Sequence, residues 1–421
     1  MKQESSLTGQ PSAWDDDAGA PIDAILSRYY GGPRRRDLTS VRALLRALDP
    51  ARPRHHVAVV GTNGKTSTAT FLARLLARGG ARVGLYTSPH IARWSERVGI
   101  DGVPVAEDEL ISTLSRVEHV AETIGQARME LRFFDLLTLA AEDIFGRAGV
   151  EVAIFEAGIG GKLDATRVLE PDLAVLTSIG LDHRHLLGST PEEILAAKLA
   201  IAPAGATVVA GSLTPELLAQ ASAWAAREGV ELDAAQDPDV DDGELPRYQR
   251  RNLSLARRAA RAAERLFGLH AAAEIAELGV WGRFERGEIG GVAYLADVAH
   301  NLTAWQELLA ELPRVSPGRR WVAVVALTGG RSPDELAWAI AGTPQVAHVV
   351  ATVTPVLTPR DPAEIIAALG EAQGPSAELC GSPARAFELA ARIARDRDLD
   401  LLVTGSNYLV SEFLAWVANP G

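Results

Sequence analysis

One segment near the N-terminus restricts the possible folds more than any other: residues 56–80, HVAVVGTNGKTSTATFLARLLARGG. It begins with an apolar run, 57–60, of the length expected for a buried strand. The glycine turn 61–64 (GTNG) follows, and apolar residues then recur at helical spacing until the glycine pair 79–80. The segment therefore predicts a strand, a tight turn and a helix in that order.

This order suits the binding of phosphate. The N–H groups of the turn and of the first helical residues point to one place, where the helix dipole also favours an anion. We expect Lys65 against the β and γ phosphates of a nucleotide, and the hydroxyl of Thr66 or Ser67 on the accompanying magnesium. The strict phosphate-loop pattern is not met, because Val59 stands where that pattern needs glycine. A plain glycine turn between strand and helix is the alternative.

The predicted nucleotide contacts take in the whole turn and the start of the helix: Gly61, Thr62, Asn63, Gly64, Lys65, Thr66 and Ser67.

Composition gives the lysine of this segment more weight. The chain has 42 Lys and Arg residues, but only four are lysines: Lys2, Lys65, Lys162 and Lys198. Arginine neither acts as a compact point charge nor loses its proton readily. A lysine kept in such a chain therefore marks a place where the chemistry of an ammonium group is needed.

Length and charge narrow the class of protein. A chain of 421 residues is too long for one ordinary core. Its net charge of −12 disfavours nucleic acid and anionic membrane surfaces as partners, and leaves small molecules. A single cysteine, Cys380, excludes an intrachain disulfide. With no apolar signal segment or membrane span in the sequence, we predict a cytoplasmic protein.

Apolar strands alternate with amphipathic helices along most of the chain, which predicts an α/β fold with parallel sheets covered on both faces. The first series runs from about 57 to 267, with an acidic surface loop at 233–246, and a second begins after a linker at 268–282. We therefore predict a disordered tail at 1–20, a nucleotide-binding domain at 21–280 and a C-terminal domain at 281–421.

Polar residues follow three predicted strands of the first series. Ser88 comes after RVGLYT, Glu156 ends VAIFEA, and His183 follows DLAVLTSI. The carboxyl ends of parallel strands meet at one edge of the sheet, where ligands bind. A hydroxyl, a carboxylate and an imidazole beside a phosphate site make a shell for magnesium, which takes few protein ligands. A glutamate that caps the turn and a solvated histidine are the alternative.

Seven motifs in order carry a resemblance to a known family: GTNGKTS, YTSPHIARWSERVGIDG, FEAGIGGKLDAT, TSIGLDH, AAKLAIA, GRFER and DVAHN. Together they resemble the folylpolyglutamate synthase and dihydrofolate synthase family of the Mur ligase superfamily, over nearly the whole chain after residue 25. The resemblance implies a central ATP-binding domain of P-loop type with a parallel sheet, followed by a smaller, Rossmann-like C-terminal domain. It also implies a monomer.

The same resemblance implies the activity. Enzymes of this family are ATP-dependent amide ligases: a substrate carboxylate attacks the γ-phosphate, and the amine of glutamate then attacks the acyl phosphate. The acceptor is a folate or dihydropteroate. Such chemistry asks the protein for positioning and for neutralisation of charge.

Site residues follow from the resemblance as well. Ser88 and Glu156 are implied to hold one magnesium, and His183 a second. Lys198 matches a lysine that the family carries as a carbamate, an anionic oxygen ligand that arginine could not provide. A lysine on a helix surface is the alternative for Lys198.

The C-terminal motif DVAHN is implied to close over the nucleotide. Asp297 is implied near the ribose, and His300 and Asn301 near the adenine. Asn252 matches a family position near the adenine, and Arg283 one near the phosphates. A strand-end turn of ordinary polar residues is the alternative.

Several positions depart from the family pattern. Thr66 stands where the family usually has glycine, and ALTGGRSPDE lacks the Asp-Lys-Asp expected after its strand. Four further residues replace the usual ones. Three are at the implied acceptor side, Asp135 for Glu, Lys162 for Arg and Arg167 for Asn, and the fourth is Leu302 for Pro. A shorter acid at 135 and an added guanidinium at 167 are expected to alter the acceptor site.

Two other functions therefore stay open at this point. A ligase of the same mechanism could use a different carboxylate or amine in a specialised pathway. A nucleotide-binding regulator without catalysis is the other. Glu156, His183 and Lys198 disfavour the regulator, because binding alone needs neither a second metal ligand nor a carbamate.

Overall fold

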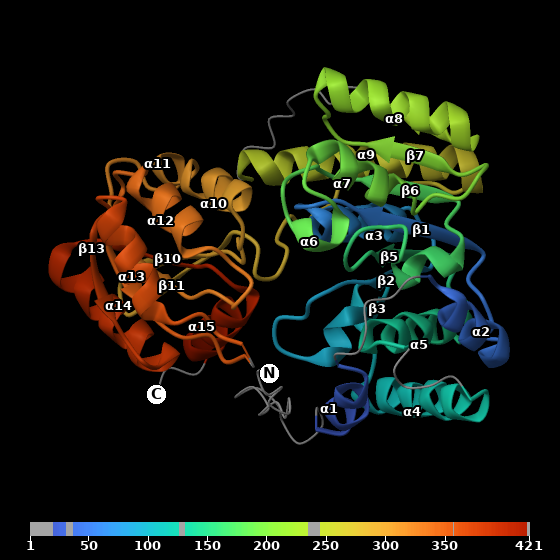
Figure 1. Ribbon diagram of the computed structural model, residues 1–421, viewed down its shortest axis with the longest axis horizontal. Coiled ribbons are helices and arrows are strands. Elements are labelled where there is room, and N and C mark those ends of the chain that lie inside the picture. The colour runs from blue at the N-terminus through green and yellow to red at the C-terminus, as the bar shows by residue number, and fades with distance from the viewer. Residues whose placement is uncertain (1–19, 31–36, 126–130, 235–244, 357, 419–421) are drawn as a thin grey trace, which may run out of the picture. The chain divides into compact units, whose positions relative to one another are not determined.

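The structure of the protein is a computed structural model, and it describes residues 20–30, 37–125, 131–234, 245–356 and 358–418. The chain divides into two compact units, the first ending at Leu278 and the second beginning at Gly279 (Figure 1). The predicted tail, up to residue 19, and most of the predicted acidic loop, 235–244, lie outside the described residues. Within the described residues, no helix has the length and apolar character needed to cross a membrane.

Among the described residues, the sheet of the first unit has eight strands, in the spatial order β4-β3-β2-β5-β1-β6-β7-β8. They are β1 (His55–Val60), β2 (Val83–Tyr86), β3 (Val98–Ile100), β4 (Val103–Pro104), β5 (Val152–Glu156), β6 (Leu173–Leu176), β7 (Thr207–Ala210) and β8 (Glu231–Asp233). β1 lies in the middle, parallel to both β5 and β6.

The predicted parallel arrangement is confirmed from β2 to β8 and is wrong at the edge, where β3 and β4 are antiparallel. Asp101 and Gly102, both with positive φ, connect these two strands. A two-residue Asp-Gly turn matches the twist of an antiparallel hairpin, which explains the difference.

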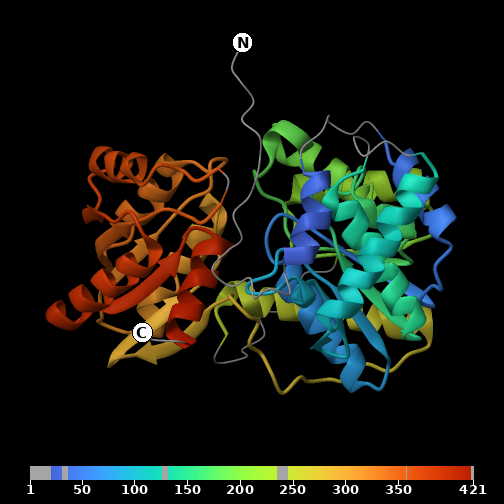
Figure 2. The same cartoon turned by 90° about the horizontal axis from the view of Figure 1, so that it is seen from below.

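Helices cover both faces of this sheet (Figures 1 and 2). They are α1 (Ala20–Leu26), α2 (Thr39–Leu48), α3 (Lys65–Arg78), α4 (Glu107–Thr123), α5 (Phe133–Arg147), α6 (Arg184–Leu187), α7 (Pro191–Leu199), α8 (Pro215–Glu228) and α9 (Arg247–Phe267), with 3₁₀ turns η1 (Ser27–Tyr29), η2 (Trp94–Arg97) and η3 (Ala165–Leu169). α3 packs against α9, and α4 against α5. The apolar residues of 56–80 that predicted a helix are buried on α3: Phe71, Leu72, Leu75 and Leu76.

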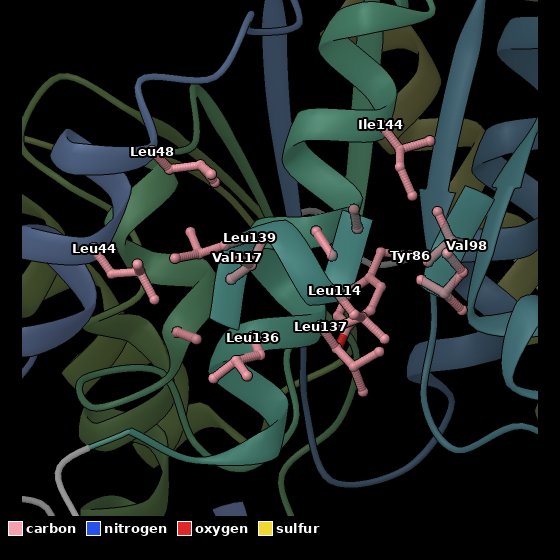
Figure 3. Close-up of a cluster of buried hydrophobic side chains, with 14 of the residues drawn as sticks. Leu44, Leu48, Tyr86, Val98, Leu114, Val117, Leu136, Leu137, Leu139 and Ile144 are labelled. Atoms are coloured by element: carbon pink, nitrogen blue, oxygen red, sulfur yellow. The ribbon is translucent and has the colours of Figure 1, made fainter. Parts of the chain in front are cut away.

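One large apolar core lies between the sheet and the pair α4 and α5 (Figure 3). Leu114 and Val117 of α4 lie here with Leu136 and Leu139 of α5, close to Tyr86 at the end of β2. Burying side chains of this size contributes about 1.5–3 kcal/mol each. The core therefore fixes the ends of the strands from which the polar loops emerge.

In the described part of the chain, the second unit has a six-stranded sheet in the order β13-β12-β11-β14-β10-β9. Its strands are β9 (Glu285–Ile289), β10 (Val292–Ala296), β11 (Trp321–Val325), β12 (Val346–Ala351), β13 (Ser376–Leu379) and β14 (Asp400–Thr404). Only β9, at one edge, is antiparallel to its neighbour. The predicted second series of strands is confirmed, and β10, β11, β12 and β14 are its parallel members.

Helices cover the sheet of the second unit as well: α10 (Leu302–Leu309), α11 (Leu312–Val315), α12 (Pro333–Ala341), α13 (Pro362–Glu371), α14 (Pro383–Arg397) and α15 (Asn407–Ala418). Trp305 and Trp321 are fully buried in its core. The predicted linker, 268–282, connects α9 with β9. The predicted class, two α/β domains of which the first has a P-loop-type nucleotide turn, is the observed one.

Candidate active site

The turn between β1 and α3 has the conformation that the sequence predicts. Gly64 is left-handed, with φ 83°, and α3 begins at Lys65. A Cβ at residue 64 would also meet the side-chain amide of Asn252 on α9, so this position requires glycine on two counts. The first N–H groups of α3 have no partners within the helix, and groups of this kind favour an anion.

Two lysines meet at this turn. The Lys65 Nζ donates to the carbonyls of Gly61 at 3.2 Å and Thr62 at 3.0 Å. The Nζ of Lys198, from α7, donates to the same Gly61 carbonyl at 2.7 Å. Lys198 is 4% exposed. Burial, and secondarily the Lys65 charge, lowers the pKa of Lys198 to about 7. A neutral amine is therefore available at Lys198 near physiological pH.

Glu156 ends β5 beside the turn and is 2% exposed. Its carboxylate accepts the Thr66 hydroxyl at 3.0 and 3.1 Å and the Ser88 backbone N–H at 3.1 Å. Three predicted residues are thus brought together, although Ser88 reaches Glu156 through its backbone. Oxygen donors of this kind suit a hard cation, which completes its shell with phosphate oxygens and water.

His183 lies on the same edge of the sheet, in the loop after β6. It has a left-handed backbone, with φ 48°, and precedes α6. Its Nε2 lies 3.9 Å from Asp182 Oδ1, and about a third of its side chain is exposed. Among the described residues, no group of three His, Cys, Asp or Glu side chains is arranged to hold a metal. Magnesium takes few protein ligands and completes its shell with phosphate oxygens and water.

Three residues expected at the acceptor side differ from the family pattern, and in the structure each contacts its own neighbourhood of the chain. Asp135 is buried, and its Oδ2 accepts the N–H of Arg132 at 2.8 Å, which caps the start of α5. Lys162 is exposed, and the Arg167 guanidinium donates to its carbonyl at 3.4 Å. Burial, and secondarily the charge of Arg42, lowers the pKa of Arg167. The shorter acid at 135 thus serves the helix in this structure.

In the second unit, the predicted nucleotide residues follow β10. The buried carboxylate of Asp297 accepts the N–H groups of Phe284 and Ala299, both at 2.8 Å. Asn301 caps α10 by accepting the Ala304 N–H at 3.0 Å. His300 Nδ1 lies 2.9 Å from the Val298 carbonyl. These bonds give the turn a defined shape.

Two more predicted positions lie beside that turn. Leu302, where the family pattern has proline, is the first residue of α10, a position that proline favours but does not require. Arg283 is half-buried in the turn before β9, where its N–H donates to the Val280 carbonyl at 2.9 Å.

Sequence reasoning missed the residues that hold the turn. Thr177 and Ser178, directly after β6, contact Asn63 through their hydroxyls. Their signal was present in TSIGLDH, whose first two residues are hydroxyl side chains at the same edge as the turn. Their partner could not be read from the sequence, because β6 pairs with β1 from a distance of more than a hundred residues.

A family model described as "Mur ligase, glutamate ligase domain" matches residues 282–407. A relative from Haloferax volcanii, named "Probable bifunctional folylpolyglutamate synthase/dihydropteroate synthase", is 32% identical over 405 residues, which cover 89% of this chain and 47% of that protein. This chain therefore spans about half the length of that relative. The "Dihydrofolate synthase/folylpolyglutamate synthase" of Escherichia coli is 30% identical over 300 residues, covering 66% of this chain and 69% of that protein.

Solved structures have the same fold. The folylpolyglutamate synthase of Mycobacterium tuberculosis complexed with ADP has a TM-score of 0.85 and 24% identity, and covers 96% of this chain and 99% of its own. The bifunctional folylpolyglutamate synthase/dihydrofolate synthase of Yersinia pestis, complexed with AMPPNP and Mn, has a TM-score of 0.81 and 26% identity, with 95% and 99% covered. The motifs, the fold and the Escherichia coli relative agree: this chain belongs to the folylpolyglutamate synthase/dihydrofolate synthase family.

Proposed function

We propose that the protein is an ATP-dependent carboxylate–amine ligase that adds L-glutamate to a folate or to dihydropteroate. The observation that carries this proposal is the meeting of Lys65, Lys198 and the Glu156 carboxylate around a turn built to bind phosphate. The family supports the substrates. Relatives carry folylpolyglutamate or dihydrofolate synthase names, and the second unit matches a glutamate ligase domain.

In the proposed reaction, the N–H groups of residues 64–67 and the Lys65 ammonium hold the phosphates of ATP. Lys65 leaves the carbonyls of Gly61 and Thr62 to do so. A carboxylate oxygen of the acceptor attacks the γ-phosphorus, and ADP leaves. The glutamate amine then attacks the acyl carbon, the amide forms, and inorganic phosphate leaves with the carboxylate oxygen. The protein aligns the reacting atoms and neutralises their charge.

A divalent metal supplies charge neutralisation at the phosphates in this proposal. Glu156 and Ser88 would hold it, with Thr66 at hand, and these oxygen donors fit magnesium. We propose His183 for a second ion. A relative of known structure holds Mn together with AMPPNP, which supports a nucleotide and a metal in one site.

We further propose that Lys198 is carbamylated. Its neutral amine attacks carbon dioxide and loses one proton, which converts a buried cation into an anionic oxygen ligand. The lowered pKa of Lys198 supports this, because only the unprotonated amine reacts. High-resolution density from crystals grown with bicarbonate tests it, since a branched side chain is expected and a plain ammonium contradicts the proposal.

The remaining assignments are also proposals. Nucleotide contacts from Asn252, Arg283, Asp297, His300 and Asn301 rest on the family resemblance. So does a monomeric state. The domain limits of 21–280 and 281–421 rest on the alternation of strands and helices, and a cytoplasmic location rests on the composition of the sequence.

A panel of acceptors and amino acids tests the function. Dihydropteroate, reduced folates and unrelated carboxylic acids are each combined with glutamate and other amino acids, in the presence of ATP and magnesium. We expect ADP release and a product heavier than the pterin acid by one glutamyl residue. Amide products from a non-folate acid alone, with none from any pterin, would overturn the substrate assignment and leave the ligase chemistry standing.

A further inference from the structure

The loop after β6, residues 177–180, is bound along its length to the phosphate turn. The Thr62 N–H donates to the Ser178 carbonyl at 2.8 Å. The Thr62 hydroxyl donates to the Gly180 carbonyl at 3.2 Å and accepts the Gly180 N–H at 3.0 Å. Two loops far apart in sequence are therefore joined through both backbone and side-chain groups, next to the proposed phosphate site.

The carbonyl of Asn63 is the centre of this contact. It accepts the Thr177 hydroxyl at 2.6 Å and the Ser178 hydroxyl at 3.0 Å, and so uses both of its lone pairs on one loop. The Ser178 oxygen also accepts the Asn63 N–H at 3.0 Å. Both faces of residue 63 are thus fixed by two neighbouring side chains.

Fixing this carbonyl also fixes the next amide. The C=O of Asn63 and the N–H of Gly64 belong to one planar trans peptide, in which they point in opposite directions. When the carbonyl points toward Thr177 and Ser178, the Gly64 N–H must point away from that loop. A donor held in place before a ligand arrives needs no reorganisation when charge appears.

Packing supports the same arrangement. A Cβ on Gly61 would overlap the Thr177 Oγ, and a Cβ on Gly211 would meet the Thr177 carbonyl. Thr177 is therefore enclosed between two glycines, with 8% of its surface exposed. Its hydroxyl is aimed at Asn63 by close packing, which a freely rotating side chain could not achieve.

We propose that Thr177 and Ser178 are positioning residues that preform the phosphate turn by locking the peptide between Asn63 and Gly64. They act through that peptide and need not touch the nucleotide. This inference rests on the proposed function, because it assumes that the turn binds phosphate.

Titration of ADP with magnesium by calorimetry, combined with thermal unfolding, tests the proposal on the full chain. Thr177→Val keeps the shape and removes the hydroxyl, and we expect its Kd for ADP to rise about 10- to 100-fold, the range for losing the bond from the Gly64 N–H to a charged phosphate. We expect Ser178→Ala to raise the Kd in the same direction and Thr177→Ser to restore it. A purely structural role predicts a lower Tm without this pattern.

Thr352 provides a matched control. It also directly follows a strand, β12, and is fully buried, and its hydroxyl has no hydrogen-bond partner within the described residues. Thr352→Val should leave the Kd for ADP unchanged. If Thr177→Val unfolds at the assay temperature, Ser178→Ala, which is only half-buried, decides the question.

The outcomes separate this inference from the proposed function. If Lys65→Ala loses ADP binding while Thr177→Val and Ser178→Ala bind ADP like the wild type, the phosphate site stands and the positioning role is refuted. If Lys65→Ala itself binds ADP with unchanged affinity, the proposed function fails first.

Discussion

The two sheets of the molecule carry polar residues at their carboxyl ends in different ways. In the first unit, side chains from separate loops converge on shared atoms. Lys65 and Lys198 both donate to the Gly61 carbonyl, although they come from α3 and α7. Nearby, the buried carboxylate of Glu156 accepts from both the helix and the loop after β2. Charged groups are concentrated here, away from water.

In the second unit, the corresponding residues bond to nearby backbone. Asp297 accepts the N–H of Ala299 in its own turn and that of Phe284 just before β9, and Asn301 caps the helix that follows it. Each side chain thus satisfies backbone N–H groups, as helix caps do. The comparison teaches that a strand-end polar residue indicates chemistry where charged side chains from several loops converge, and architecture where it bonds only to backbone N–H groups.

Removal of the Lys65 side chain is expected to have the largest effect on activity. We expect Lys65→Ala to abolish measurable ADP release, a loss of at least about 1,000-fold, because the proposal places the Lys65 ammonium against the phosphates. Steady-state kinetics measure this, with unchanged Tm as the sign of an intact fold. Arg78→Ala, at the exposed far end of the same helix, is the control and should retain full activity. Turnover by a folded Lys65→Ala protein would refute the phosphate turn.

Thr66 tests the role of Glu156, because its hydroxyl donates from α3 to that carboxylate. Thr66→Val leaves that carboxylate without one donor, and we expect the magnesium concentration for half-maximal activity to rise about 10- to 100-fold. Thr66→Ser should behave like the wild type. Thr68→Val, whose buried hydroxyl has no partner among the described residues, is the matched control. An unchanged magnesium requirement in Thr66→Val would count against Glu156 as the metal carboxylate.

Lys198 makes a prediction about pH. Its pKa is about 7 in the folded protein and 10.5 ordinarily, so between these values the unfolded chain binds more protons than the folded one. Stability must then rise with pH in this window and be lost as pH falls from 10.5 toward 7. In carbon dioxide-free buffer, we expect the urea concentration at the unfolding midpoint of the wild type to rise relative to that of Lys198→Met between pH 7 and 10. A constant difference between the two proteins would show that Lys198 titrates normally.

The smallest expected effect comes from a substitution in the second unit, and it concerns stability. Asn301→Ala removes the cap of α10, and we expect a loss of about 1 kcal/mol in the free energy of unfolding. Denaturant unfolding of the full chain measures it. Asn301→Ser, which can also cap, should recover most of the loss. If Asn301→Ala is as stable as the wild type, the capping role assigned to this turn is wrong.

Local features of the fold could be predicted from the sequence. The apolar run before Gly61 and the helical spacing after Lys65 lie within one short segment, and their geometry depends on neighbours in the chain. The hairpin of β3 and β4 was also signalled, by Asp101 and Gly102, but its strands are too short to stand out by alternation. Its antiparallel edge was therefore missed.

For the candidate site, the sequence predicted which residues share an edge of the sheet, but it did not predict which of them contact each other. Strand ends placed Ser88 and Glu156 on one edge with the turn, since parallel strands share their carboxyl ends. That Asn63 meets Thr177 depends on β1 lying between β5 and β6, an order that no local pattern records. Asp135, expected near the acceptor, bonds to the start of α5, a partner that its residue type does not indicate.

Transfer of an oxygen label tests the central claim most directly. Dihydropteroate carrying ¹⁸O in its carboxylate is incubated with ATP, magnesium and L-glutamate, and the inorganic phosphate is analysed by mass. Attack of the carboxylate on the γ-phosphate predicts one ¹⁸O atom in each phosphate released, at a rate equal to amide formation. Amide product accompanied by unlabelled phosphate would contradict the acyl-phosphate mechanism and the role assigned to the turn.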